Sequence, residues 1–78
     1  MENERELTYG EKAVGLSFNP GGSPGVDKVK TAYAAIIDQL AAMREKSEDQ
    51  EQKRLLSVAI TEAQGAQMWA VKGITWGL

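Results

Sequence analysis

The chain has 78 residues and a mass of 8.5 kDa, so it forms one domain at most. It contains no cysteine and no histidine. Disulfides and cysteine-based metal sites are therefore excluded, and the commonest metal ligand and general base are missing. The net charge is −2, whereas duplex nucleic-acid binders normally carry a basic face, so DNA is not an expected partner.

The small size of the chain predicts self-association. A single core of this size supplies only about 3–5 kcal/mol unless disulfides, a metal or a partner add to it. No metal or cofactor is expected from this composition, which leaves other copies of the chain. No apolar run is long enough to span a membrane, and the acidic start, Met1-Glu-Asn-Glu-Arg-Glu6, does not have a signal peptide's basic and then apolar pattern. We expect a soluble cytoplasmic protein.

The first predicted element is a short helix over about residues 8–15. Thr8-Tyr-Gly-Glu11 matches the capping box, and Gly15 is a suitable left-handed stop. A turn-rich loop over residues 16–23 follows, in which Asn19-Pro20-Gly21 is a turn signal. Phe18 in this loop either pins the loop to the rest of the fold or presents its ring to a ligand. Lone loop aromatics usually pack, which favours the first alternative.

A second helix is predicted over residues 24–46, because Ser23-Pro24 supplies a cap and a proline at the first helical position. Its apolar residues recur at heptad spacing and predict the buried seam. The seam consists of Val26, Val29, Tyr33, Ile36, Leu40 and Met43. The polar residues Asp38, Gln39, Arg44, Glu45 and Lys46 are expected to keep the far end soluble.

A long helix is predicted over about residues 48–76, beginning at a second capping box, Ser47-Glu-Asp-Gln50. The short connection makes it an antiparallel neighbour of the second helix. Its apolar side chains point in most directions, so more than one side must be covered. Met68, Trp69 and Trp76 are interpreted as core or interface residues. The fold class is therefore all-α: a short N-terminal helix plus an antiparallel two-helix hairpin, in one domain over residues 1–78 that assembles as a homo-oligomer.

The residues favour binding over catalysis. Without His and Cys the usual nucleophile–base pairs cannot form, so an enzyme is not expected. The loop lacks the Gly-Lys-Ser/Thr ending of a P-loop. Its glycine amides nevertheless lead into a helix N-terminus that carries Lys28 and Lys30, an arrangement that attracts anions. Tyr9 and Phe18 flank the glycines of this loop and offer aromatic faces on which bases can stack. These features fit a small phosphate-bearing ligand, or an ordinary connector.

Several segments together resemble one known family. These are Ser17-Phe-Asn-Pro-Gly21, Val26-Asp-Lys-Val-Lys30, Ala35-Ile-Ile-Asp38, Val58-Ala-Ile-Thr-Glu62 and Ala66-Gln-Met-Trp-Ala-Val-Lys-Gly-Ile-Thr-Trp76. From about Leu7 to Trp76 the chain resembles the phage-encoded anti-CBASS cyclic-oligonucleotide sponges, whose helical hairpin is shared with sponges acting against Thoeris defence. The Met68-Trp-Ala-Val-Lys72 segment is the most specific part of the resemblance.

The resemblance implies a compact homohexamer in the cytoplasm of the bacterial host infected by a bacteriophage. It implies that the protein binds cyclic dinucleotides such as cyclic GMP-AMP, made by bacterial cyclases during infection, and holds them without cleavage. The host effector is then not activated.

The resemblance also implies particular binding residues. In the family a tyrosine of the N-terminal helix stacks on a base, and a lysine after the loop meets a phosphate. By position these residues are Tyr9 and either Lys28 or Lys30. The remaining residues expected at the cyclic-dinucleotide site are Phe18, Asn19, Pro20 and Gly21.

Family members also bind cyclic trinucleotides at a separate site, where long helices of several subunits meet. Arg54, Ser57 and Thr61 share one face of the long helix and are the corresponding residues here.

A different class of function stays open beside this one. The chain could be a structural or adaptor hairpin that binds a host protein through its surplus apolar face. A small nucleic-acid-binding phage protein is a third interpretation, which the acidic balance disfavours.

Overall fold

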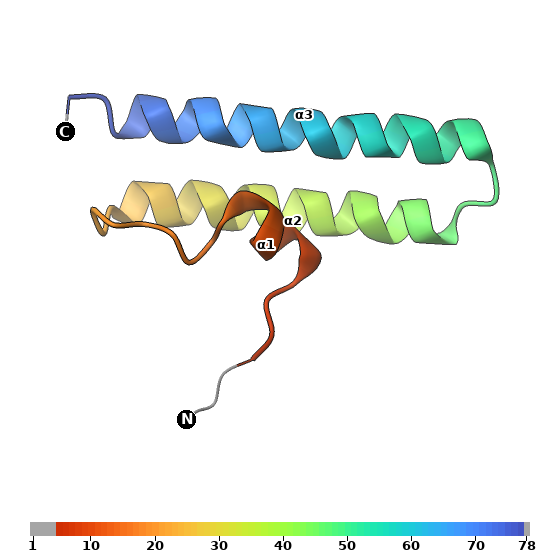
Figure 1. Cartoon of the computed structure of the whole chain (residues 1–78), viewed down its shortest axis with the longest axis horizontal. Coiled ribbons are helices and arrows are strands. Elements are labelled where there is room, and N and C mark those ends of the chain that lie inside the picture. Colours follow the sequence, from red (N-terminus) through yellow and green to blue (C-terminus); the bar gives the residue numbers. More distant parts are fainter. Residues whose placement is uncertain (1–4, 78) are drawn as a thin grey trace.

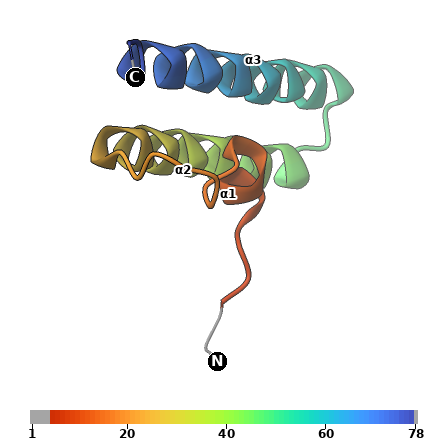
Figure 2. The same ribbon diagram turned by 60° about the vertical axis from the view of Figure 1, so that its left-hand side comes forward.

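The fold is a helical hairpin with a short helix packed on it. A computed structural model describes residues 5–77, so the first four residues of the acidic start and Leu78 lie outside it. The helices are α1 (Tyr9–Val14), α2 (Pro24–Lys46) and α3 (Gln50–Ile74), and residues 5–77 contain no strand. Figures 1 and 2 show α2 and α3 lying side by side and running in opposite directions. The predicted all-helical hairpin is confirmed.

The start of α1 is fixed by a capping box, as predicted. The Thr8 hydroxyl accepts a hydrogen bond from the Glu11 N–H at 3.1 Å, and the Glu11 carboxylate accepts one from the Thr8 N–H at 2.9 Å. Arg5 donates two further bonds to that carboxylate, at 2.8 and 2.9 Å. The bonds from Arg5, followed by the bond from Thr8, lower the pKa of Glu11 to about 2. Gly15 ends the helix at φ 65°.

A very close backbone approach holds α1 on α2. The Gly10 N–H donates a hydrogen bond to Asp38 Oδ1 at 2.7 Å. A Cβ on Gly10 would lie 2.1 Å from the Ala34 carbonyl oxygen, which no real contact allows. The interpretation of Asp38 as a solubilising residue is therefore wrong, because its half-buried carboxylate binds the first turn of α1.

The buried side of α2 differs from the predicted seam. Ile36 and Met43 are about half exposed, while Ala34 and Ile37 are buried. The buried stripe is displaced because α2 packs against both α1 and α3. Ala34 and Ile37 lie on the part of α2 that faces these two helices, whereas Ile36 and Met43 do not. The core cluster consists of Val14, Ala34, Ile37 and Ile60, with Ala13, Leu16, Tyr33, Leu40, Ala41 and Ala63 packed around it.

The helix starts agree with the prediction for α2 but not for α3. The Ser23 hydroxyl accepts from the Val26 N–H at 3.3 Å, with Pro24 at the first helical position. The predicted capping box at Ser47 is wrong. Ser47 instead follows the last turn of α2, and Asp49 caps α3 by accepting from the Gln52 N–H at 2.9 Å. Asp49 is favoured because the Ser47 hydroxyl is bonded to the backbone of Asp49.

Large apolar side chains remain uncovered on α3. Trp69 is 73% exposed and Trp76 78% exposed, and Met68 is also exposed, so none of them belongs to the core of the single chain. The helices packed against α3, α2 and α1, leave these side chains uncovered. No helix among the described residues is long and apolar enough to cross a membrane.

We predict that Gly10→Ala destabilises the fold by about 1–3 kcal/mol or more, because the new methyl group must displace the backbone of α2. Gly73→Ala is the matched control, since Gly73 is also helical and a Cβ there meets nothing within 4 Å. The control should be neutral or stabilising by up to about 1 kcal/mol. Urea denaturation of both variants provides the measurement, and equal midpoints would contradict the close approach.

Candidate functional site

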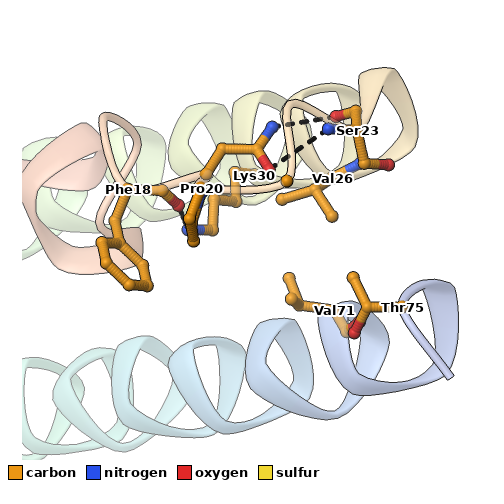
Figure 3. A pocket seen from close by; sticks show the side chains of 9 residues that line it. Phe18, Pro20, Ser23, Val26, Lys30, Val71 and Thr75 are labelled. Atoms are coloured by element: carbon orange, nitrogen blue, oxygen red, sulfur yellow. Dashed lines mark hydrogen bonds between the residues drawn. The ribbon is translucent and has the colours of Figure 1, made fainter. Parts of the chain in front are cut away.

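The loop before α2 forms one wall of a pocket. The pocket has a volume of about 340 Å³ and lies between this loop, the start of α2 and the last turns of α3. Figure 3 shows Val71 and Thr75 of α3 pointing toward the loop, with the Phe18 ring at the other end of the group. The lining residues are Phe18, Asn19, Pro20, Gly21, Ser23, Val26, Lys30, Val71 and Thr75. Five of the residues expected to bind a cyclic dinucleotide therefore surround one cavity.

Lys30 supplies a buried positive charge at this pocket. Its residue is only 5% exposed, and its ammonium donates to the carbonyl oxygens of Gly15 at 2.9 Å and Phe18 at 2.5 Å. The same nitrogen lies 5.6 Å from the centre of the Phe18 ring. An ammonium has three N–H donors, so one donor remains after the loop carbonyls are bonded. Lys30 can thus hold the loop and still meet an anion.

Asn19 stabilises the loop through hydrogen bonds to nearby residues. Its side-chain NH₂ donates to the Ser23 carbonyl and to the Asp27 carboxylate, both at 2.9 Å. Its backbone carbonyl accepts from the Gly22 N–H at 3.0 Å, and Gly22 adopts φ 67°. The polar atoms of Asn19 are therefore engaged within the loop. Asn19 shapes the pocket wall through these bonds.

Phe18 does not pin the loop by burying its ring. The residue is 72% exposed, whereas the loop is held by Lys30 and Asn19. The first alternative for Phe18 is therefore wrong for the single chain. An open aromatic face beside an ammonium is available to a ligand.

The other predicted residues of the dinucleotide site lie apart from the pocket. Lys28 is exposed on α2 and does not line the cavity. Tyr9 is 49% exposed, and its ring centre lies 5.8 Å from the guanidinium carbon of Arg44. Neither Tyr9 nor Arg44 is among the residues that line the cavity. One chain thus presents Tyr9 and the loop pocket as two separate places.

Arg44 is a residue that the sequence reasoning assigned only to solubility. It is half-buried, and its guanidinium donates to the Ser57 hydroxyl at 2.9 Å. It therefore touches α1 through Tyr9 and α3 through Ser57. The sequence spacing could have revealed this role. Arg44 comes seven residues after Ile37 and fourteen after Lys30, which places it on the buried stripe of α2.

The residues expected at a cyclic-trinucleotide site are only partly open. Arg54 is exposed and donates to the Glu51 carboxylate at 3.0 and 2.6 Å, which lowers the pKa of Glu51. Ser57 is bonded to Arg44, and Thr61 is exposed. An anion at Arg54 would compete with Glu51 for the guanidinium.

A second hollow lies on the exposed apolar face of α3. Its walls are Gly65, Met68, Trp69 and Lys72, and the Lys72 ammonium lies 5.7 Å from the Trp69 ring centre. Within residues 5–77 no group of three or more acidic side chains could hold a metal ion.

The comparison with family models identifies the chain. The family described as Acb2/Tad1, hairpin domain, matches residues 11–75. The chain belongs to this family, the anti-CBASS and anti-Thoeris sponges. The family is known for binding cyclic oligonucleotides, and its hairpin domains are sponge-type binders rather than enzymes. Neither the curated proteins nor the solved structures contain a significant match to the chain.

We predict different outcomes for the two lysines of the α2 start. Lys30→Met leaves two partly buried carbonyl oxygens without their donor, at a cost of about 1–3 kcal/mol. Lys28→Met removes an equal charge from an exposed position and should change stability by less than about 0.5 kcal/mol. Urea denaturation measures both, and hydrogen exchange of the loop amides should accelerate only in Lys30→Met. Equal stability losses would show that the ammonium of Lys30 does not hold the loop.

Proposed function

We propose that the protein binds cyclic dinucleotides such as cyclic GMP-AMP and sequesters them from the effectors of bacterial CBASS defence. The family match over residues 11–75 is the observation that carries this proposal. The loop pocket adds chemical support, since it combines a buried ammonium with an open aromatic ring. On this proposal the chain is a bacteriophage immune-evasion protein that acts in the cytoplasm of the infected host.

The proposed ligand site includes residues from two copies of the chain. Tyr9 offers a stacking face and the Lys30 pocket offers a charge, but Tyr9 is not among the residues that line that pocket. Two copies packed together can bring Tyr9 of one against the loop of the other. Self-association, as a hexamer by resemblance, would then complete the site.

Sequestration without cleavage fits the composition. The chain has no histidine and no cysteine, so the commonest general base and the thiolate nucleophile are missing. The bound messenger would be held and later released intact. The proposed second site, for cyclic trinucleotides, stays with Arg54, Ser57 and Thr61 of α3.

We predict that cyclic GMP-AMP binds, with Tyr9→Ala weakening affinity at every salt concentration because it removes a stacking face worth roughly 1–3 kcal/mol. Titration calorimetry measures the affinity. The ligand released by heat should then co-elute with untreated cyclic GMP-AMP on chromatography. Linear product would rule out a sponge, and an absence of binding to any cyclic oligonucleotide would contradict the proposed function.

We predict that the protein sediments as an oligomer at micromolar concentration. Trp69→Glu places a charge in the exposed apolar face and should reduce the assembly, whereas each chain should stay folded because Trp69 is not in its core. Gln52→Glu adds the same charge at an exposed position of α3 and serves as the control. A folded wild-type monomer would contradict the shared site.

An adaptor function is the second candidate, and the exposed face around Met68, Trp69 and Trp76 favours it. Apolar patches of this kind often mark protein interfaces. On this alternative the face binds a host protein, and cyclic nucleotides have no measurable affinity. The calorimetric titration therefore separates the two functions.

A further inference from the structure

Two positively charged side chains of α2 lie beside an aromatic face. One is the pocket charge of Lys30 next to Phe18, which the proposed function already uses. The other is Arg44 next to Tyr9, at the opposite end of α2. The second pair lies outside the pocket, and the resemblance assigns a role only to its tyrosine.

We propose that Arg44 binds a phosphate of the nucleotide whose base stacks on Tyr9. This inference rests on the proposed function, because it concerns the same cyclic dinucleotide. A cyclic dinucleotide has two phosphodiester groups, and the loop pocket supplies a cation for one of them. Arg44 supplies the cation for the other.

The geometry at Tyr9 supports a phosphate contact. The guanidinium carbon lies 5.8 Å from the ring centre, so the charge is held against the ring. In a nucleotide only the ribose separates the base from its phosphate, so a base on the open part of the ring brings a phosphate close to that charge. About half of the Tyr9 residue is exposed, which leaves room for the base.

The guanidinium also has free donors. It carries five N–H groups, and within residues 5–77 it donates one hydrogen bond, to the Ser57 hydroxyl at 2.9 Å. Among these residues no carboxylate forms an ion pair with it, in contrast to Arg54, which is paired with Glu51. Arg44 is moreover half-buried and fixed from both sides, so little side-chain freedom is lost when a phosphate binds. A planar guanidinium can bond two phosphate oxygens at once.

The test compares two charge-removing variants for cyclic GMP-AMP binding. Arg44→Met should weaken binding roughly 10-fold or more, as expected for a lost charge-assisted contact. The loss should be larger at low salt than at high salt, because exposed charges are screened. Lys46→Met is the matched control: it removes the same charge from an exposed position two residues further along α2. It should change affinity by less than about 2-fold, as expected for a surface charge without a ligand contact.

A conservative variant separates contact from packing. Arg44→Lys keeps the charge but loses the planar fork, so it should weaken binding several-fold while keeping the wild-type salt dependence. If Arg44→Met does not fold, this variant decides the question. Wild-type affinity in Arg44→Lys would then overturn the proposal.

Each outcome has a distinct meaning. If wild-type protein binds and Tyr9→Ala weakens it, but Arg44→Met and Lys46→Met behave alike at both salt concentrations, the role of Arg44 is wrong and the proposed function stands. If wild-type protein does not bind cyclic GMP-AMP at all, the proposed function itself fails.

Discussion

The hydrogen bond from the Gly10 N–H to Asp38, at 2.7 Å, and the absence of a Cβ at Gly10 together determine how α1 lies on α2. Both ends of α1 carry something that the proposed ligand site uses. Tyr9 precedes Gly10 and is thereby held near Arg44. Gly15 ends the helix, and its carbonyl accepts from Lys30, so the loop begins at the pocket. A shift of α1 along α2 would therefore disturb the stacking face and the pocket together.

The hairpin buries few large side chains in its own core, and this bears on its proposed function. Within the described residues, Ile37 and Ile60 are the only large side chains less than 2% exposed. The tryptophans of α3 lie outside the core and are exposed. A chain of this kind would gain stability in the proposed oligomer by packing against copies of itself. The same packing can unite Tyr9 with a loop pocket that belongs to another copy.

The sequence was most informative where one local interaction decides the structure. The caps at Thr8 and Ser23 and the left-handed Gly15 are such cases, and they were predicted correctly. The prediction of Ser47 as the helix cap was wrong because two possible capping residues, Ser47 and Asp49, lie within three positions. The predicted seam of α2 and the predicted roles of Asp38 and Arg44 were wrong for a different reason. They depend on where α1 crosses α2, and periodicity along one helix does not contain that information.

Net charge and local charge have opposite signs in this protein, and the proposed ligand site uses the local charge. The chain carries −2 overall, and such a balance disfavours long polyanions. Lys30 is nevertheless buried against carbonyl oxygens and Arg44 is held between an aromatic ring and a hydroxyl. Such sites have fewer competing counterions and less screening than surface lysines such as Lys28. On the proposed function a small cyclic dianion with two bases would contact both sites, whereas duplex DNA would meet an acidic protein. The distribution of charge therefore favours a small nucleotide messenger over a nucleic-acid chain.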